Sequence, residues 1–385
     1  MKIGRIKKNK TAKDFLVDTN LINIDRKDLV DNYVKLSILS ILAGYKKSDY
    51  IYVNDCFEKT NLKKLDSFIS YVLNHNIAPK RYNIRIKHKK RFVRKNKLGK
   101  LNNYDSILCF SGGLDSTAGL LYALNKKQKI LPIWIDFGQR NNIFEHKAAK
   151  KPLSKLNISF ISIKIDLNRF ILDGWREWDF IVPGRNFLFL SLANAFLQNS
   201  TKRKGNIYLC AHKDEMGYLK NRDKSKYFFE ASSNLFSNDN KKIIATTPFD
   251  SYSKSEIISY WRRKWEKKFR ISPHETTTCY YENGCGICEA CLKRAIYLTA
   301  AGYNIKSRYK INPFKDPSGL IIKKWIPNII SNQISRSNKL DFLIAIEESI
   351  DIVPRAVRDF FENLPKQTLK TMKKRRKEIE LIELS

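Results

Sequence analysis

Short apolar runs alternate with helical patterns through the middle of the chain. The runs are SILCF at 106–110, ILPIWID at 130–136, ISFISIKI at 158–165 and NIYLCA at 206–211. Helical patterns lie between them, after residue 115, from about 144 and at 185–198. Apolar strands separated by helices are typical of a parallel sheet that is covered on both faces. The pattern therefore predicts an α/β fold with a doubly wound parallel sheet over residues 104–305.

The two flanks of this region show other patterns. Apolar positions recur at helical spacing over 29–43 and 61–74, with the apolar run YIYV at 50–53 between them. We therefore expect residues 1–100 to form a small α/β accessory domain. The segments KLDFLIAIEESI and AVRDFFENL predict helices in residues 306–385, which are expected to form a C-terminal helical extension.

The composition favours a cytoplasmic protein that attracts anions. The 385 residues are 43% hydrophobic and carry a formal net charge of +35. No apolar run is long enough to span a membrane, and the basic start lacks the apolar stretch of a secretory signal. We therefore expect no membrane partner. The sequence does not fix the oligomeric state, and a homodimer stays open.

Positive charge is concentrated in two stretches. Residues 80–100 contain eleven Lys or Arg and no acid, and KKRRK occupies 373–377. Such charge attracts polyanions, so nucleic acid is one candidate partner for the arm at 80–100. Basic runs are more often solvated surface or docking patches, and this second interpretation is preferred.

A glycine turn follows the first strand of the central region, in SILCFSGGLDSTAGLLYAL at 106–124. Gly112 and Gly113 allow the backbone to approach a guest closely, and the helix that opens near Asp115 adds its positive end. Three hydroxyl groups can add hydrogen bonds: those of Ser111, Ser116 and Thr117. The turn therefore suits an anion such as a phosphate, although it lacks the lysine of the usual phosphate loop. The alternative is a plain connection between strand and helix.

The sequence SGGLDS after an apolar strand resembles the signature of the PP-loop ATP pyrophosphatases. The resemblance implies that ATP is cleaved between its α and β phosphates, that AMP is transferred to an oxygen of the substrate, and that the loop holds the leaving pyrophosphate. Adenylation in place of γ-phosphoryl transfer would account for the missing lysine. The implied ATP- and pyrophosphate-binding residues are Ser111, Gly112, Gly113, Leu114, Asp115, Ser116, Thr117, Asp136 and Gln139.

Four of the seven cysteines are close together. Cys279, Cys285, Cys288 and Cys291 follow the pattern C-x5-C-x2-C-x2-C. Four thiolates at such spacing predict a tetrahedral structural Zn²⁺ site without an open position, and the alternative is a set of free thiols. The other three are expected to be buried thiols: Cys56, Cys109 and Cys210.

Further motifs are similar to those of 7-cyano-7-deazaguanine synthases, over about 200 residues. They are DFGQR at 136–140 with Glu145 after it, VPGRN at 182–186, DEMGYLKNRD at 214–223, YSKSEI with Lys254 and Glu256, and CLKRAIYLTAAG at 291–302. The resemblance implies that the substrate is 7-carboxy-7-deazaguanine. Its carboxylate would be adenylated by ATP, ammonia would displace AMP to give the amide, and a second ATP would dehydrate the amide to the nitrile.

The same resemblance implies the site residues. The catalytic set is Ser111, Asp115, Ser116 and Lys254, and the substrate-binding set is Arg140, Gly184, Arg185, Asn186, Asp214, Tyr218 and Asp223. Lys254 would supply the missing cation to the phosphates, unless it is a surface lysine of its helix. Asp115 or Asp223 would hold Mg²⁺, although Asp115 could instead only cap its helix.

Several assignments within these sets carry alternatives. Arg185 suits a carboxylate and Asn186 a ring edge, whereas Gly184 could serve the turn alone. Gln139 and Arg140 would line the pocket or close a turn. Tyr218 would stack on the base or belong to the core. His212 follows a strand end and is expected to be structural.

The chain departs from an ordinary synthase by its two extensions. An enlarged, basic form resembles the synthase-like proteins of bacterial anti-phage systems, namely type IV CBASS and Qat. That resemblance implies that the activated carboxylate is passed to an amine of a partner protein from the same operon. The alternatives are a metabolic nitrile synthase and a non-enzymatic module that binds nucleic acid or a partner.

Overall fold

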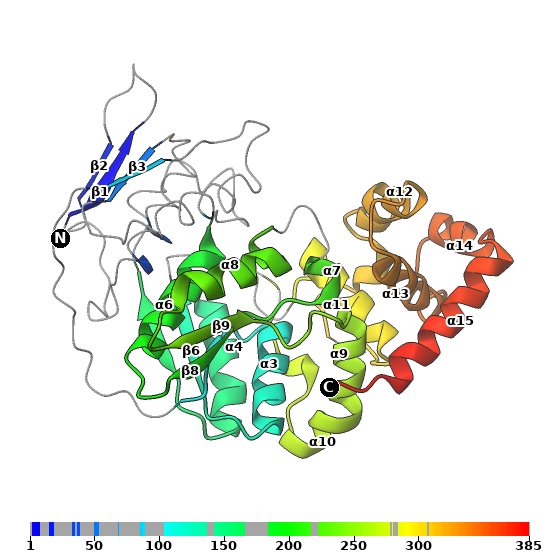
Figure 1. The fold of residues 1–385 in the computed structure, drawn as a ribbon. Helices are drawn as coiled ribbons and strands as arrows, with labels where there is room; N and C mark the ends of the chain where they lie inside the picture. The colour runs from blue at the N-terminus through cyan, green and yellow to red at the C-terminus, as the bar shows by residue number, and fades with distance from the viewer. Residues whose placement is uncertain are drawn as a thin grey trace.

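A five-stranded parallel sheet forms the centre of the molecule (Figure 1). Its strands are β5 (Ser106–Cys109), β6 (Ile130–Asp136), β7 (Ile161–Lys164), β8 (Lys204–Tyr208) and β9 (Lys242–Thr246). They lie in the order β7-β6-β5-β8-β9, and each neighbouring pair is parallel. The predicted α/β fold with a parallel, doubly wound sheet is thereby confirmed.

The computed structural model describes most of the chain after residue 103. The described residues are 2–7, 15–18, 33, 34, 37, 38, 50–53, 68, 85–88, 104–136, 142–165, 184–216, 222–277, 279, 284–305 and 308–384.

Helices cover both faces of the sheet. They include α3 (Leu114–Asn125), α4 (Asn142–Lys155), α6 (Arg185–Gln198), α8 (Lys226–Phe236), α9 (Lys254–Tyr260) and α11 (Glu289–Ala300). Successive strand residues point to opposite faces, so Ile107 packs with α6 and α8, whereas Leu108 packs with α3, α9 and α11. Both faces are therefore apolar, which explains why the strands read as continuous apolar runs.

Most central elements lie where the sequence predicts them. The helix predicted over 185–198 is α6, and the run at 130–136 is β6. The run at 206–211 is only partly a strand, because β8 ends at Tyr208. Neither β9 nor α8 is predicted from the sequence.

The C-terminal part is helical, as the sequence predicts. Its elements, together with the short helices before it, are α7 (Lys213–Met216), η3 (Arg222–Lys224), η4 (Trp261–Trp265), α10 (Glu266–Phe269), η5 (Pro273–Glu275), η6 (Pro313–Lys315), η7 (Ile321–Trp325), α12 (Ile326–Ile330), α13 (Arg336–Glu347), α14 (Arg355–Glu362) and α15 (Lys366–Leu381). Helix α13 packs on α11, and α15 packs on α9 and α13. Phe342 and Met372 belong to the same buried cluster as Leu108, so the extension shares the core of the central region.

The N-terminal part contains a second, four-stranded sheet. Its strands are β1 (Lys2–Lys7), β2 (Phe15–Asp18), β3 (Tyr50–Val53) and β4 (Arg85–His88), in the order β2-β1-β3-β4. Strand β3 is the predicted run YIYV. Of the two helices predicted here, residues 33, 34, 37, 38 and 68 are described and helical. Strand β4 lies within the basic stretch 80–100 and pairs with β3, so residues 85–88 of the predicted basic arm belong to this sheet.

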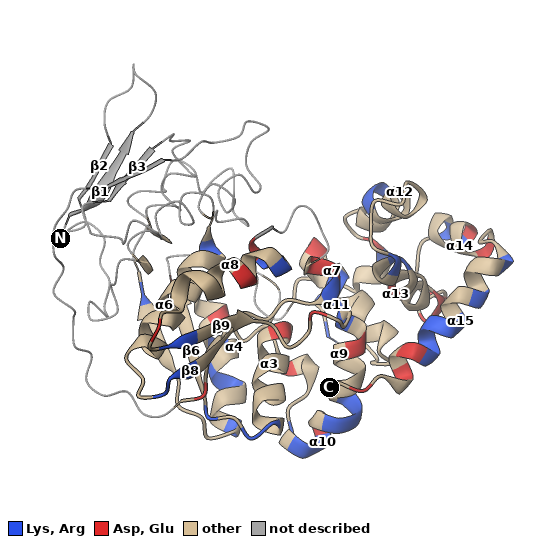
Figure 2. Ribbon diagram, in the orientation of Figure 1, with Lys and Arg blue, Asp and Glu red and all other residues tan. Residues whose placement is uncertain are grey.

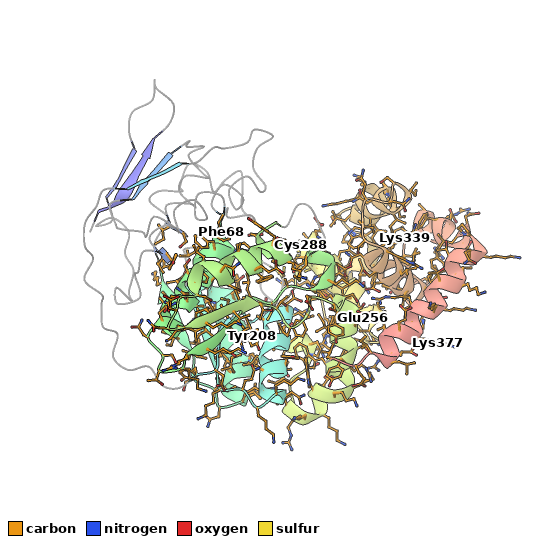
Figure 3. The ribbon with its side chains drawn as sticks, viewed as in Figure 1. Phe68, Tyr208, Glu256, Cys288, Lys339 and Lys377 are labelled. Carbon is orange, nitrogen blue, oxygen red and sulfur yellow. The ribbon has the colours of Figure 1, made fainter. Side chains whose placement is uncertain are left out.

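Two aromatic side chains connect the N-terminal part to the central region. Phe68 lies between Phe187 of α6 and Phe228 of α8, with ring centroids 4.8 and 5.7 Å away (Figure 3). The Tyr33 hydroxyl donates a hydrogen bond of 2.8 Å to the carbonyl of Leu235. The N-terminal part is therefore anchored on the face of the sheet that α6 and α8 cover.

Basic side chains are prominent on α10 and along α15 (Figure 2). The run KKRRK lies in α15, where Lys373 and Lys374 are exposed but Arg375 is only 6% exposed. The interpretation of this run as surface charge is therefore wrong for Arg375. Within the described part of the chain, no helix is both long and apolar enough to cross a bilayer.

Candidate active site

The glycine turn lies at the switch point of the sheet. Strand β5 is central, and the chain proceeds from it to β6 on one side and later to β8 on the other. In such sheets ligands bind beyond the carboxyl ends of the strands at this point. The turn at 111–113 follows β5, and His212 follows β8, so residues from both halves of the sheet meet here.

Gly112 allows the turn to pack tightly against α4. Its φ is +72°, and a Cβ atom would lie 2.4 Å from the backbone nitrogen of Ala149. A side chain is therefore excluded both by the backbone conformation and by space. The carbonyl of Gly112 also accepts a 3.2 Å hydrogen bond from the Thr277 amide, which fixes the outer side of the turn.

The serines of the turn bind one another and the backbone. The hydroxyls of Ser111 and Ser116 lie 3.2 Å apart, and Ser116 donates to the carbonyl of Gly113 at 3.2 Å. Gly113 is the N-cap of α3 and offers no side chain to its first-turn amides. That helix start, with Leu114 and Asp115, is therefore suited to an anion. Thr117 is fully buried, so its hydroxyl lies beneath the turn.

Lys254 and Asp115 form an ion pair across the site. The ammonium of Lys254 lies 3.0 Å from the Asp115 carboxylate, and it also lies 5.6 Å from the ring centroid of Tyr297. Burial opposes the charge of Lys254, but Asp115 and Glu215 outweigh it and raise the pKa of the lysine. Lys254 is thus held as a cation beside the glycine turn.

Two residues join this site that the sequence analysis did not assign to it. Ligand atoms of Asp115, His212 and Glu215 all lie within 4.8 Å of one another. His212 is only 4% exposed, and its contact with Glu215 is 3.8 Å. Burial raises the pKa of Glu215, but Lys224, His212 and Lys254 overcome this and lower it far below its ordinary value. A sequence signal exists, because both residues directly follow β8 at the switch point.

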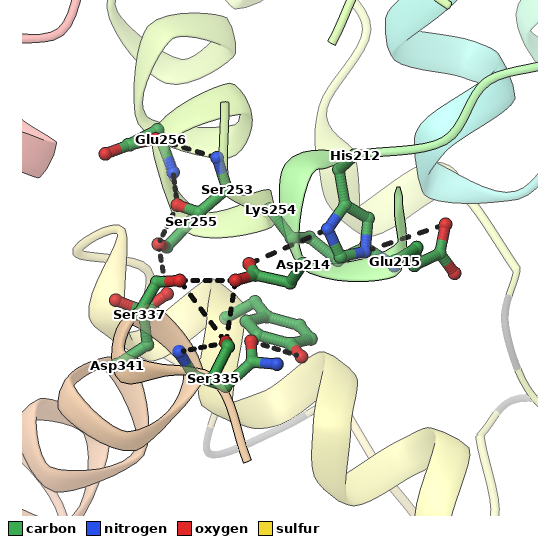
Figure 4. Close-up of polar contacts among 12 residues, drawn as sticks. His212, Asp214, Glu215, Ser253, Lys254, Ser255, Glu256, Ser335, Ser337 and Asp341 are labelled. Carbon is green, nitrogen blue, oxygen red and sulfur yellow. Dashed lines mark hydrogen bonds and ion pairs between the residues drawn. The ribbon is translucent and has the colours of Figure 1, made fainter. Parts of the chain in front are cut away.

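Asp214 binds the C-terminal extension. It accepts hydrogen bonds from the hydroxyls of Ser335, at 2.7 Å, and Ser337 (Figure 4). Its other neighbour is Nδ1 of His212, 3.7 Å away. Burial favours the neutral acid, but these contacts together lower the pKa of Asp214. In the structure this carboxylate connects the end of β8 to α13.

Other residues predicted for the substrate lie at the start of α6. Gly184 is its N-cap with a φ of +70°, and Arg185 lies 5.9 Å from the Phe189 ring. Asn186 is buried and donates a 3.3 Å hydrogen bond to the carbonyl of Asp223. Asn186 and Asp223 are thereby brought together.

The remaining predicted residues fall in two groups. Asp136 ends β6, is 8% exposed and accepts a 2.9 Å hydrogen bond from Asn142. Three lie outside the described residues: Gln139, Arg140 and Tyr218.

The four clustered cysteines converge at the start of α11, where Cys288 is the N-cap and Cys291 lies in the first turn. Their sulfur atoms lie within 4.8 Å of one another, with separations of 3.5 Å for Cys279–Cys285 and 3.8 Å for Cys279–Cys288 and for Cys285–Cys291. A tetrahedral zinc ion with bonds of about 2.3 Å requires sulfur separations of about 3.8 Å. The cluster could therefore bind zinc. Cys109 and Cys210 are buried in the central region, as expected, and Cys56 lies outside the described residues.

Comparison with known proteins agrees with this geometry. The family model of the queuosine biosynthesis protein QueC matches residues 105–174 and 177–302, which is just over half of the chain. A 7-cyano-7-deazaguanine synthase of Leptospira interrogans is 30% identical over 215 residues, covering 50% of this chain and 86% of the relative. One from Vesicomyosocius okutanii is 30% identical and covers 53% of this chain and 96% of the relative. One from Thermoplasma volcanium is 28% identical and covers 54% and 92%.

The matched segments contain the glycine turn, Lys254 and all four clustered cysteines. The chain is therefore a PP-loop protein that belongs to the QueC family.

Proposed function

We propose that this protein uses ATP to adenylate the carboxylate of 7-carboxy-7-deazaguanine and then transfers the acyl group to an amine. The observation that carries this proposal is the ion pair of Lys254 with Asp115, 3.0 Å long, at the start of α3. The pair holds a point charge beside the glycine turn, which contains no lysine of its own to bind a phosphate. The synthases to which the chain is similar are named for the nitrile product of this substrate class.

The chemistry is the activation of a poor leaving group. A carboxylate oxygen attacks the α-phosphorus of ATP, the bond to the bridging oxygen of the β-phosphate breaks, and pyrophosphate leaves. The amides at the start of α3 and the Lys254 ammonium would stabilise the charge that develops on the pyrophosphate. The amine then attacks the acyl carbon, AMP leaves, and an amide forms with release of one proton.

Asp115 and Glu215 would hold a magnesium ion for this reaction. Asp115 Oδ1 and Glu215 Oε2 are buried and have no hydrogen-bond partner among the described atoms. Carboxylate oxygens are the ligands that Mg²⁺ prefers, whereas the imidazole of His212 suits it less. When bound, Mg²⁺ would neutralise phosphate charge. The metal-binding groups found among the described residues include Asp115 but not Asp223, so Asp115 is the stronger of the two predicted ligands.

The cysteine cluster would hold a structural zinc ion. Four sulfur ligands leave no open position for substrate, so the ion would organise the chain between η5 and α11. It supplies structure there and takes no part in the transfer.

The acceptor amine distinguishes two versions of the proposal. In the favoured version it belongs to a partner protein, as the resemblance to anti-phage proteins implies. Support comes from the parts of the chain outside the matched residues 105–302, namely the N-terminal sheet and the C-terminal helices. In the alternative, ammonia is the acceptor and the nitrile is the product, as the names of the relatives suggest.

One experiment separates these versions. The purified protein is incubated with ATP, Mg²⁺ and 7-carboxy-7-deazaguanine, with ammonia or with the products of the neighbouring genes. Release of AMP and pyrophosphate supports adenylation, and its absence overturns the proposal. An acceptor protein that gains the mass of an amide-linked deazaguanine supports conjugation. Efficient nitrile formation without any protein partner supports the alternative.

A further inference from the structure

Arg375 of the C-terminal helix contacts the start of the helix that presents Lys254. It donates hydrogen bonds to the Glu256 carboxylate and, at 2.6 Å, to the hydroxyl of Ser253. These two residues form the capping box of α9, in which Ser253 accepts from the Glu256 amide and Glu256 accepts from the Ser253 amide. Arg375 therefore binds the cap of the helix whose first residue is Lys254.

A second buried charge completes this network. Asp341 of α13 is 0% exposed and accepts a 3.0 Å hydrogen bond from Nε of Arg375. Its other carboxylate oxygen accepts from the hydroxyl of Ser255 in α9. The extension thus contributes one buried acid and one buried base to the first turn of α9.

The start of α13 contacts the other side of the same site. Ser335 and Ser337 donate to Asp214, the residue between His212 and Glu215 (Figure 4). Asn338 accepts a 3.0 Å hydrogen bond from the hydroxyl of Tyr297, whose ring faces the Lys254 ammonium.

Burial of an ion pair costs desolvation and is poor evidence for stability, since apolar residues of similar size often serve as well. The best-attested use of buried charged groups is to specify one arrangement of the parts that they join. Arg375 joins Asp341 of α13 to the cap of α9, and Ser335, Ser337 and Asn338 at the start of α13 contact Asp214 and Tyr297 around Lys254. The residues that make these contacts, 335–375, lie outside the matched segments 105–302.

We propose that Arg375 and Asp341 are positioning residues, through which the C-terminal extension sets the place of Lys254 against Asp115 and the phosphates. This inference rests on the proposed function, because it assigns a role in adenylation to a part of the chain beyond the matched family segments. The extension would act through the cap of α9 and would not touch substrate.

The test compares two neighbouring arginines of α15. Arg375→Lys keeps the charge but cannot donate to Glu256, Asp341 and Ser253 together. Arg376→Lys is the matched control, because the ion pairs of Arg376 with described residues are those with Glu347 and Glu348, at the exposed C-terminal end of α13. If Arg375→Lys does not fold, the double variant Arg375→Gln with Asp341→Asn removes the charges of both proposed positioning residues at once and leaves Glu256 with its hydrogen bond from the Ser253 amide.

Three readouts are taken on folded protein. The first is kcat and KM for pyrophosphate release, where kcat is expressed per binding site and the sites are counted by titration with a non-hydrolysable ATP analogue. The second is the rate at which an amine reagent labels Lys254. The third is amide hydrogen exchange over residues 254–260. Arg375→Lys should lower kcat on the order of 10²-fold, because misplacing a group near the reacting atoms has such effects. Labelling of Lys254 and exchange of α9 should be faster, while Arg376→Lys should match the wild type.

If Arg375 only stabilises the fold, Arg375→Lys should reduce the number of sites that bind the ATP analogue and leave kcat per site unchanged. Folded Arg375→Lys or the double variant with wild-type kcat and unchanged Lys254 labelling would overturn the inference. If the wild type itself releases no pyrophosphate, the proposed function fails. Labelling and exchange then still decide whether Arg375 positions Lys254.

Discussion

The ammonium of Lys254, in the first turn of α9, lies 3.0 Å from the carboxylate of Asp115, in the first turn of α3. An acid is favourable at the start of a helix, whereas a base there is opposed by the helix dipole. Lys254 is therefore an unfavourable residue for the first turn of α9, yet it lies beside the glycine turn, paired with Asp115. Local conflicts of this kind are expected at functional sites.

Replacing Lys254 should remove most of the adenylation activity. Lys254→Gln deletes the positive charge next to the leaving phosphates, and we expect kcat/KM for pyrophosphate release to fall on the order of 10²–10³-fold. Lys264→Gln is the control, because Lys264 is half exposed and pairs with Glu383 away from the site. Equal activity of the two variants would remove Lys254 from the mechanism.

Replacing Glu215 should weaken binding of a divalent cation. Glu215→Gln removes one of the two carboxylates proposed as ligands, each of which has a buried oxygen without a hydrogen-bond partner among the described atoms. Affinity for Mn²⁺, measured by electron paramagnetic resonance, should fall about 10–100-fold. Glu230→Gln, at an exposed residue of α8 that pairs with Lys226, should change nothing. Unchanged Mn²⁺ affinity in Glu215→Gln would argue for another metal site.

Gly112→Ala should destabilise the protein. The left-handed backbone and the overlap with the Ala149 backbone together should cost about 2–4 kcal/mol of unfolding free energy, measured by urea denaturation. Gly113 has a φ of −74°, and a Cβ there would meet the Ser111 hydroxyl at 3.2 Å and, at the ordinary contact distance of 3.5 Å, the Thr277 carbonyl. Gly113→Ala should therefore cost less than about 1 kcal/mol. Similar losses in both variants would show that the turn is not held against α4.

The cysteine cluster should carry one zinc ion per chain. Cys288→Ser removes one of four ligands, so the variant should lose zinc and several kcal/mol of stability, by metal analysis and thermal unfolding. A chelator should destabilise the wild type but not this variant. Cys109→Ala, at a buried thiol outside the cluster, should keep the full zinc content. A wild-type protein without bound zinc would contradict the assignment.

His274 should make the protein less stable as the pH falls below neutrality. Burial, with the nearby guanidinium groups of Arg308 and Arg294, lowers the pKa of His274 to about 4. The unfolded chain takes up a proton near pH 6.5, whereas the folded chain does so only near pH 4. The contribution of neutral His274 to the free energy of unfolding is therefore fully present above pH 6.5 and is lost as the pH falls toward 4.

Between pH 7 and 5, His274 should account for a loss of about 2 kcal/mol. The measurement is urea unfolding at several pH values. His274→Gln cannot titrate and should show a flatter pH dependence over this interval. Identical slopes in both proteins would contradict the prediction.

The sequence predicts the central elements because apolar runs and turn glycines are local signals. SILCF and ILPIWID are buried on both faces of the sheet, and each became a strand. Strand β9, KIIAT, is short and begins with a lysine, so its apolar signal is weak. Helix α15 is rich in Lys and Arg, and its few buried positions give little apolar pattern.

The missing parts of the site depend on contacts between distant residues. Arg375 is one of five basic residues in a row, and nothing local distinguishes it from its neighbours. Its burial follows from Asp341 and Glu256, which are 34 and 119 residues away in the chain. His212 and Glu215 likewise lie near Asp115 only because β8 pairs with β5 in the sheet. Sequence motifs are sufficient to locate the glycine turn. The residues that surround the turn are brought together by tertiary packing and cannot be identified from local sequence.

The shared interior of the central region and the last 80 residues limits how this gene can be rearranged. Phe342, Leu343 and Met372 are almost wholly enclosed among side chains of α9 and α11. A protein ended by a stop codon shortly after residue 305 would open that interior to water and would aggregate. Replacing this tail with an unrelated sequence would therefore require matching changes along α9 and α11, so the two parts are expected to be inherited as one unit.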